Sequence, residues 1–292
     1  MNHRCTLRMA IVAVLAVLTL AACAQTPTPT PPPVITQPPV ATEPATAVTT
    51  PVVSEQTTWE RVQKTGKMVV ATSADYRPFE FYDDNFLLDG FDIALMREIG
   101  KQLGVTIEFK DFAFDGLPGA LMLGQADAVI SALTITPERR EAVDFSATYY
   151  VGEDAVLAKA GSAIPNLTAV EQLANYIIGV ERGSVYESWI TTALVTTGKM
   201  PAENLRAYGK VEQAVGDLEQ GRVELVVLDL LPAQEYVQAG RAKLVGRGAN
   251  RQQFGIAVRK GDSDLLAQIN NALTVLQNEN VIAELSQQYL KL

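Results

Sequence analysis

Histidine and cysteine are nearly absent from this 292-residue chain, which contains one histidine and two cysteines. His3 and Cys5 precede an apolar stretch near the N-terminus, and Cys23 follows it. If the chain is cleaved before Cys23, the product keeps one cysteine, at its first position, and no histidine. Such a product cannot use a histidine general base, a Ser–His or Cys–His nucleophile, a histidine-bound metal or an internal disulfide. Most hydrolase chemistry is thereby excluded.

Basic residues are also in deficit. The chain has 24 basic and 33 acidic side chains, for a formal charge of −9, and the first 22 residues contribute two arginines and no acid. An acidic surface repels polyanions, so the sequence excludes nucleic acid as a partner. The acidity is compatible with simple solubility and with a weak attraction for cationic ligands. With 48% hydrophobic residues, the chain can bury a sizeable core.

The longest apolar run, Met9 to Leu20, is too short to span a bilayer comfortably. Arg4 and Arg8 precede it, and Leu20-Ala21-Ala22-Cys23 ends it. This pattern indicates a secretory signal over residues 1–22, and it resembles the lipobox of bacterial lipoproteins. The resemblance implies cleavage before Cys23, lipid on the Cys23 thiol and attachment to a membrane. An uncleaved anchor and plain secretion are the alternatives, and each places the protein outside the cytoplasm.

Residues 23–58 predict a tether that follows the lipidated cysteine. Nine of the fifteen prolines lie between Pro27 and Pro51, interleaved with threonine. Proline fixes φ and lacks a backbone donor, so we expect an extended, semi-rigid linker of polyproline type. A ligand for a proline-recognition domain is the alternative.

From Trp59 onward, strand-like and helix-like patterns alternate, which predicts an α/β fold with mostly parallel sheets. We expect Asp92 to cap a helix that ends near Gly104. The other predicted helices are 117–123, from 185, 211–219, from 230, 265–276 and 281–290. The predicted strands are 68–72, 105–109, 128–130, 176–180, 204–208, 224–228 and 254–258.

Nine short motifs, in their order and spacing along the chain, resemble the polar amino-acid solute-binding proteins of bacterial ABC importers. They are Thr72-Ser73-Ala74-Asp75-Tyr76-Arg77-Pro78-Phe79-Glu80-Phe81, Gly90-Phe91-Asp92-Ile93, Phe114-Asp115-Gly116-Leu117, Gly124-Gln125-Ala126-Asp127-Ala128, Thr134-Ile135-Thr136-Pro137-Glu138-Arg139, Asp144-Phe145-Ser146, Arg182-Gly183-Ser184, Gly221-Arg222-Val223-Glu224, and Gly255-Ile256-Ala257-Val258-Arg259-Lys260-Gly261, with Asp229 after its strand. Together they cover nearly all of 59–292.

The resemblance implies a two-lobed periplasmic-binding-protein-like fold, in which two hinge strands join two α/β lobes. The first lobe would comprise 59–152 plus 252–292, and the second 153–251, with crossings near 149–158 and 243–256. It further implies a monomer without cofactor or enzymatic activity. That monomer binds a small-molecule amino acid between its lobes and delivers it to the transmembrane permease of an ABC transporter.

Arg139 is the expected partner of the ligand carboxylate. A guanidinium matches a carboxylate with two parallel hydrogen bonds. By resemblance, backbone N–H groups at Thr134 and at Ser184 assist it, and Ser184 lies in the turn that leads into Val185 and the following helix. The alternative for Arg139 is a solvated helix residue.

Asp229 is the expected partner of the ligand ammonium, because it ends an apolar strand at the edge that faces the crevice and matches the family's aspartate there. A helix N-cap is the alternative role. The carbonyl of Ser131 and the hydroxyl of Thr134 would complete the ammonium shell, in which Ala132 replaces a hydroxyl found in some relatives.

Tyr76 and Phe114 match the aromatic residues that sandwich the ligand side chain, although aromatic residues at such positions are also common in cores. Ser73 occupies a place where several relatives carry aspartate, and Glu181 could supply the missing charge. A salt bridge from Glu181 to Arg182, or plain exposure of Glu181 to solvent, is the alternative. These residues favour a cationic ligand such as arginine or lysine, with glutamine next.

Two other functions stay open. An enzyme similar to cyclohexadienyl dehydratase needs an acidic residue in place of histidine or cysteine, and Glu181 is the candidate. A receptor that senses its ligand without feeding an importer is the second alternative.

Overall fold

The computed structural model describes residues 56–291, which belong to one compact unit. The predicted signal segment, Cys23 and nearly all of the tether lie outside the described residues. Within the described part, no helix has the length and apolarity to cross a membrane.

The first sheet has the strand order β5-β1-β6-β13-β7, and β13 alone runs against the other four. Its strands are β1 (Lys67–Thr72), β5 (Thr106–Asp111), β6 (Ala128–Val129), β7 (Val143–Phe145) and β13 (Ala257–Arg259). The helices around it are α1 (Thr58–Thr65), α2 (Phe91–Leu103), α3 (Leu117–Met122), α4 (Pro137–Ala142), α9 (Ser263–Asn278) and α10 (Val281–Leu285). A 3₁₀ turn over Phe114–Gly116 precedes α3, and a π turn over Ser286–Leu290 follows α10.

The second sheet repeats this design with the order β10-β9-β11-β8-β12, in which β8 is the reversed strand. Its strands are β8 (Tyr150–Lys159), β9 (Ile178–Glu181), β10 (Leu205–Tyr208), β11 (Leu225–Asp229) and β12 (Ala242–Phe254). Its helices are α5 (Val170–Leu173), α6 (Val185–Ile190), α7 (Val211–Glu219) and α8 (Leu230–Gln238). Short turns lie at Thr191–Val195 (π) and Ala202–Asn204 (3₁₀). The mostly parallel sheets that the alternation predicts are therefore present.

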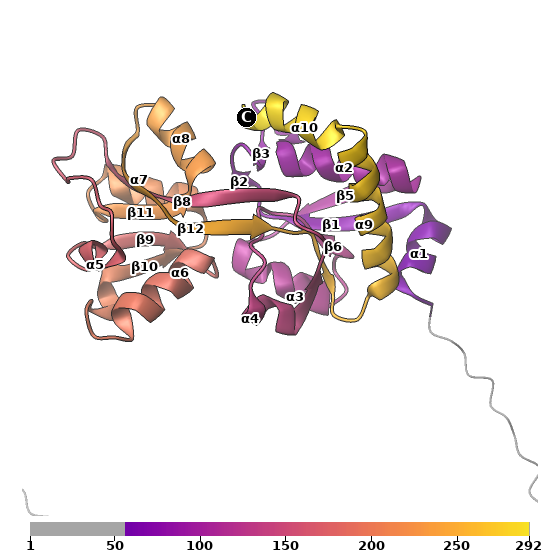
Figure 1. Ribbon diagram of the computed structural model, residues 1–292, viewed down its shortest axis with the longest axis horizontal. Helices are drawn as coiled ribbons and strands as arrows, with labels where there is room; N and C mark the ends of the chain where they lie inside the picture. The colour runs from indigo at the N-terminus through magenta and orange to yellow at the C-terminus, as the bar shows by residue number, and fades with distance from the viewer. Residues whose placement is uncertain (1–55, 292) are drawn as a thin grey trace, which may run out of the picture. The chain divides into compact units, whose positions relative to one another are not determined.

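Two long strands join the sheets. β8 and β12 pair antiparallel from Phe254–Tyr150 to Ala242–Lys159, with irregular pairing between Arg247 and Arg251. Figure 1 shows them side by side as the link between the first lobe, built on the first sheet, and the second lobe, built on the second. Two adjacent connecting strands of this kind allow the lobes to turn about a shared hinge.

Each lobe has its own apolar core. In the first lobe, buried residues of β1, α2, α9 and the Phe79–Phe91 aromatic cluster pack together, and a second cluster lies under α3. In the second lobe, buried residues lie on both faces of the sheet, against α6 on one side and α7 and α8 on the other. Separate cores let each lobe move as a rigid body.

A small antiparallel sheet, made of β2 (Asp75–Tyr76), β3 (Glu80–Tyr82) and β4 (Leu88–Asp89), carries the first binding motif. The sequence patterns did not predict it, because its strands have only two or three residues. It directs Asp75 and Tyr76 toward the second lobe and buries Glu80 inside the first.

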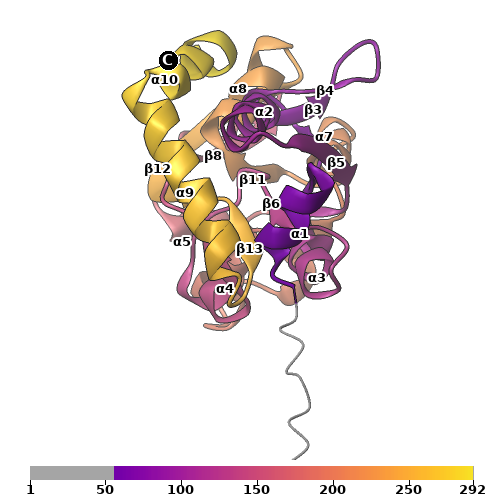
Figure 2. The same ribbon diagram turned by 90° about the vertical axis from the view of Figure 1, so that its right-hand side faces the viewer.

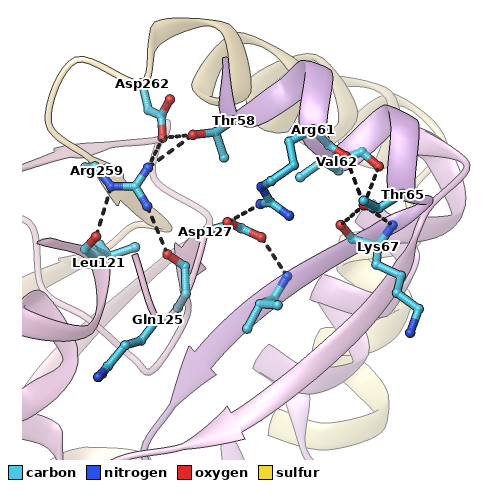
Figure 3. A network of polar contacts seen from close by, with 12 residues as sticks. Thr58, Arg61, Val62, Thr65, Lys67, Leu121, Gln125, Asp127, Arg259 and Asp262 are labelled. Carbon is cyan, nitrogen blue, oxygen red and sulfur yellow. Dashed lines mark hydrogen bonds and ion pairs between the residues drawn. The ribbon is translucent and has the colours of Figure 1, made fainter. Parts of the chain in front are cut away.

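Polar contacts fix the first helix of the described chain to the first lobe (Figure 3). Thr57 caps α1, and its capping box with Glu60 is complete. The Thr58 hydroxyl donates to Asp262, which also accepts from Arg259, and Arg61 pairs with Asp127. Seen from the first lobe, α1 lies beside the long helix α9 (Figure 2). The predicted tether is therefore followed by a helix that these contacts hold to the first lobe.

Two local predictions are wrong. Asp92 does not cap α2: the N-cap is Gly90, and Asp92 is buried two residues later. Gly90 is required there, because it has φ +121° and an added Cβ would lie 2.2 Å from the carbonyl oxygen of Phe79. The predicted strand 254–258 is also divided, since β12 ends at Phe254 and β13 begins at Ala257.

Candidate functional site

A cavity lies between the two lobes. The cavity is small, with a volume of about 20 Å³. Thirteen residues line it: Ser73, Tyr76, Glu80, Phe114, Ser131, Ala132, Thr134, Arg139, Glu181, Ser184, Val185, Tyr186 and Asp229. The structure thus brings all eleven predicted site residues to one space. That space has room for about one water as it stands, so a larger ligand requires the lobes or side chains to move.

The cavity is formed where parallel strands end. Ser73 follows β1 and Ser131 lies just after β6 in the first lobe, while Glu181 and Asp229 end β9 and β11 in the second. The carboxyl ends of parallel strands are the usual ligand-binding edge of open α/β sheets. The two lobes face each other with these edges.

Arg139 reaches from α4 across the cavity. Its Nη1 donates to the carbonyl of Thr134 at 2.7 Å, and its Nη2 donates to the carbonyl of Gly183 in the second lobe at 3.0 Å. Its guanidinium carbon lies 5.4 Å from the centre of the Phe114 ring. Burial lowers the pKa of Arg139 to about 10, while Asp229 and Glu181 oppose the shift. The side chain therefore stays cationic at neutral pH, and it is not an ordinary solvated helix residue.

Asp229 accepts hydrogen bonds from two tyrosine hydroxyls. Tyr76 of the first lobe donates to Oδ2 at 2.6 Å, and Tyr186 donates to Oδ1 at 2.7 Å. Asp229 stands at the N-cap position of α8, but its side chain makes no capping hydrogen bond. Burial raises the pKa of Asp229 to about 6, and the two hydroxyls and Arg139 limit that rise. The carboxyl is thus ionised at neutral pH and directed into the cavity.

Glu181 is a second acid of the second lobe. It is 8% exposed, and its carboxylate has no hydrogen-bond or ion-pair partner in the described part of the chain. Arg182, the alternative partner, instead donates to the carbonyl of Ala207. Burial, reinforced by Asp75 and Asp229, raises the pKa of Glu181 well above its ordinary value. A cation brought next to this carboxyl would restore its charge.

The remaining predicted residues form the walls. Ser73 N–H donates to Ser131 Oγ at 3.0 Å, which ties together the loops after β1 and β6. Ser184 caps α6 by accepting from Glu187 N–H, and its own N–H donates to the carbonyl of Glu181. Val185 begins α6. Tyr76 closes the cavity through its hydroxyl rather than serving only as an aromatic wall.

Sequence reasoning missed two lining residues, Glu80 and Tyr186. Glu80 lies in the Pro-Phe-Glu-Phe segment of the first motif, and its alternation with Phe79 and Phe81 gives no sign that an acid is buried there. Tyr186 follows Ser184 by two residues, and its position in the first turn of α6 was the available signal.

The chemistry of the cavity is that of a split charged site. One lobe contributes a guanidinium and the other contributes two carboxyls, so a zwitterion can be held at both ends when the lobes meet. Within residues 56–291, no three His, Cys, Asp or Glu side chains gather to form a metal site.

Two hinged α/β lobes with a cavity between them are the architecture of solute-binding proteins. The chain belongs to the bacterial extracellular solute-binding proteins, family 3, whose model matches residues 68–292. The resemblance noted in the sequence and the two-lobed fold are thereby confirmed.

Named relatives are of similar length. The chain is 30% identical to the L-cystine-binding protein TcyJ of Escherichia coli K12 over 78% of this chain and 84% of the relative. It is also 30% identical to the arginine-binding extracellular protein ArtP of Bacillus subtilis, over 76% and 86% of the two chains.

Among solved structures, an ancestral arginine-binding protein bound to arginine matches with a TM-score of 0.71 and 36% identity, over 77% of this chain and 98% of that one. An ancestral amino acid-binding protein, described as a precursor of cyclohexadienyl dehydratase, matches with a TM-score of 0.71 and 31% identity, over 80% and 99%.

Proposed function

We propose that this protein is the extracytoplasmic receptor of an ABC importer for a polar L-amino acid, with arginine or lysine preferred and glutamine next. It captures the ligand between its lobes and delivers it unchanged to a permease. The observation that carries the proposal is that Arg139 and Asp229, on opposite lobes, line one cavity.

The two ends of an amino acid match these two groups. Arg139 offers a planar fork for the ligand carboxylate, and Asp229 offers an ionised oxygen pair for the ammonium. Tyr76 and Tyr186 already donate to Asp229, so the ammonium must replace at least the Tyr76 hydroxyl or share Asp229 with it. That exchange keeps the buried carboxylate satisfied in both states.

Glu181 supports a cationic side chain. Its buried carboxyl lies close enough to the acids Asp75 and Asp229 for both to raise its pKa, and no described group neutralises it directly. A guanidinium or ammonium placed there would pair with an otherwise costly buried charge. An amide could instead donate to the same oxygens, which is why glutamine comes second.

Capture would proceed by closure. Four polar contacts join the lobes in this structure: Tyr76 to Asp229, Asp75 to the N–H of Val211, Arg139 to the carbonyl of Gly183, and the ion pair of Lys210 with Asp111. Each breaks if the lobes separate about β8 and β12. A ligand that touches both lobes stabilises the closed form, because only that form satisfies both ends of it.

Calorimetric titration of residues 56–292 against each of the twenty amino acids tests this proposal. We expect one or a few cationic or polar L-amino acids to bind far more tightly than millimolar, with a small-angle scattering signal of compaction. Binding no tighter than about millimolar to all twenty would contradict it.

The lipid anchor belongs to the same proposal. Cleavage before Cys23 and lipid on its thiol would hold the receptor, as a monomer with the lobe boundaries 59–152 plus 252–292 and 153–251, on a tether of residues 23–58. Mass spectrometry of the membrane-extracted protein should show an acylated N-terminal cysteine, and Cys23→Ala should release the protein from membranes. An unmodified native protein in the soluble fraction would contradict the anchor.

An enzyme remains the second candidate, because the raised pKa of Glu181 is what a general acid at neutral pH requires. The likeness to a dehydratase precursor agrees with it. The protein should then convert prephenate to phenylpyruvate, and Glu181→Gln should abolish that conversion. The complete pair of Arg139 and Asp229 favours binding alone.

A further inference from the structure

Two buried carboxyl groups lie side by side at the floor of the cavity. Glu80 of β3 is 1% exposed and lines the cavity, and Asp92 of α2 is fully buried behind it. No role in ligand capture falls to either of them in the function proposed above. Buried acids without a cation nearby need a specific arrangement of donors.

One oxygen of each carboxyl is well satisfied. Glu80 Oε1 accepts from the Ser131 hydroxyl at 2.9 Å. Asp92 Oδ2 accepts from the Ala132 N–H at 2.7 Å and from the Tyr149 hydroxyl at 2.8 Å. These contacts connect the acids to the loop that follows β6 and to the residue that precedes hinge strand β8.

The other oxygen of each carboxyl, Glu80 Oε2 and Asp92 Oδ1, is buried without any donor from the rest of the described chain. Each carboxyl shifts the pKa of the other, and the two acids hold adjacent residues of one loop, Ser131 and Ala132. Two ionised carboxylates cannot bond, since neither has a proton to donate, whereas one proton between them satisfies both oxygens. Asp92 already accepts two hydrogen bonds on its far oxygen, so the proton resides on Glu80.

We propose that Glu80 and Asp92 share one proton at neutral pH, and that this acid pair positions the Ser131–Ala132 segment of the ligand site. The proposal rests on the proposed function for the identity of the site. Glu80 and Asp92 are positioning residues, because they act through the loop that they hold.

The loop needs such support. Ala132 has φ +42°, in the left-handed region that residues with a side chain rarely adopt. Its N–H is the group bound by Asp92, while the preceding Ser131 side chain is bound by Glu80. Removing the acid pair would release both contacts, and the carbonyl of Ser131 would no longer be fixed toward the ammonium of a ligand.

The surroundings favour retention of the proton. Burial raises the pKa of Asp92 to about 7 and that of Glu80 well above its ordinary value. The groups beside the pair are Asp75 of β2 and Tyr149 before β8, and Asp229 of β11 and Arg139 of α4 line the same cavity as Glu80. Asp75 opposes a second negative charge on the pair, and Arg139 is bound to carbonyls.

The sign of the pH effect follows from the raised pKa values. The folded protein holds the proton more tightly than the unfolded chain, so the contribution of the pair to stability is complete at low pH. It is lost as the pH rises through the pKa of the pair in the folded state. Ligand affinity should fall over the same interval, because the second charge disrupts the loop.

Glu80→Gln and Glu80→Ala test the proposal, with the exposed Glu108→Gln as the matched control. The amide of Gln can donate permanently to Asp92 Oδ1 while its oxygen accepts from Ser131. The affinity for L-arginine, or for the tightest ligand of the twenty, should therefore remain within about threefold at pH 7 in E80Q. It should fall by about tenfold or more in E80A, which leaves buried groups unpaired.

The decisive comparison is the pH profile between pH 5 and 9. The native protein and E108Q should lose affinity at high pH, and E80Q should show a flatter profile. Carbon-detected NMR should find the Glu80 carboxyl protonated at pH 7 in the absence of ligand. An ionised Glu80 at pH 7, or an E80Q protein as weak as E80A, would overturn the proposal.

Failure of the proposed function gives a different result. If no amino acid binds, thermal unfolding still reports the pair: E80Q should match the native melting temperature at pH 7 and E80A should not. That result would keep the acid pair and refute only its link to amino acids. Tight amino-acid binding together with an E80Q as damaged as E80A would refute only the acid pair.

Discussion

The two lobes share one sheet design but contribute opposite charges to the site. Each has five strands with one of them reversed, and each presents the carboxyl ends of its parallel strands to the other. The first lobe contributes the cation Arg139 and a buried acid, Glu80, that has a second acid beside it. The second contributes the ionised Asp229 and the unpartnered Glu181.

Because of this difference, the two lobes have different roles in ligand binding. The walls of the first lobe are cross-linked by hydrogen bonds from Ser73 to Ser131, from Ser131 to Glu80 and from Ala132 to Asp92, so they are preorganised. The second lobe keeps two acids whose charge is incompletely compensated until a cationic group arrives. A ligand should therefore gain much of its electrostatic stabilisation from the second lobe and its orientation from the first.

The strongest test of this comparison is Asp229→Asn. We expect affinity to fall by at least about 30-fold, since removing one partner of a buried charge pair costs roughly 2–5 kcal/mol. Asn keeps the shape and can still accept from one tyrosine hydroxyl, so the fold should persist. Titration calorimetry measures the effect, with the exposed Asp264→Asn as control. An unchanged affinity would show that Asp229 does not bind the ligand ammonium.

Arg139→Lys should have the next largest effect, a loss of about 10- to 20-fold. Lys keeps the charge but cannot reach the Thr134 and Gly183 carbonyls and a ligand carboxylate with one planar fork. The neighbouring Arg140→Lys, which is exposed, should bind as the native protein does. Equal binding by both variants would show that charge alone matters at this position.

The sequence predicted the site better than the local structure around it. Six of the eleven site residues lie within the family motifs, and the other five lie beside a motif or at a strand end. The strand ends share one edge of each sheet, which is why these residues meet at one cavity. The prediction failed where contacts are distant in sequence. Asp92 looks like a helix cap because it precedes an apolar helical face, but its partners are Ala132 and Tyr149, 40 and 57 residues away.

Helices and strands were likewise predicted well where the local pattern is regular, and poorly where contacts with distant residues decide the structure. Helix α7 was predicted with its observed bounds, 211–219, since its apolar face has regular spacing. The small sheet β2-β3-β4 was not predicted, because strands of two or three residues are too short to show a periodic pattern. The break at Gly255 was missed as well: an added Cβ would lie 2.8 Å from Ile135, a contact with another part of the lobe.

Glu181→Gln should change selectivity more than affinity. Arginine should bind about tenfold more weakly, and glutamine should bind within about threefold of the native value, because the amide still offers an oxygen to a donor. In the native protein, arginine affinity should also fall as the pH drops through the raised pKa of Glu181, since protonation removes the charge that attracts it. Calorimetry at several pH values checks both, and equal losses for both ligands would contradict a selectivity role.

Asp75→Ala should give the smallest of these effects and act mainly on closure. Asp75, in the first lobe, accepts from the N–H of Val211 at 2.9 Å, while Lys210, the N-cap residue of α7, has no side-chain capping bond of its own. The first lobe thus caps a helix of the second, and it does so only when the lobes meet. Loss of a cap costs about 1 kcal/mol, so affinity should fall about fivefold.

The loss should appear as faster ligand release, because Asp75 stabilises the closed complex and does not line the cavity. Stopped-flow fluorescence separates the two rates, and Asp84→Ala, an exposed acid in the loop between β3 and β4, is the matched control. Asp75→Asn should keep most of the native affinity, since the side-chain oxygen of Asn can also cap α7. A slower association rate with unchanged release would instead place Asp75 on the path of ligand entry. The contact of Asp75 with α7 would then have no role in holding the lobes closed.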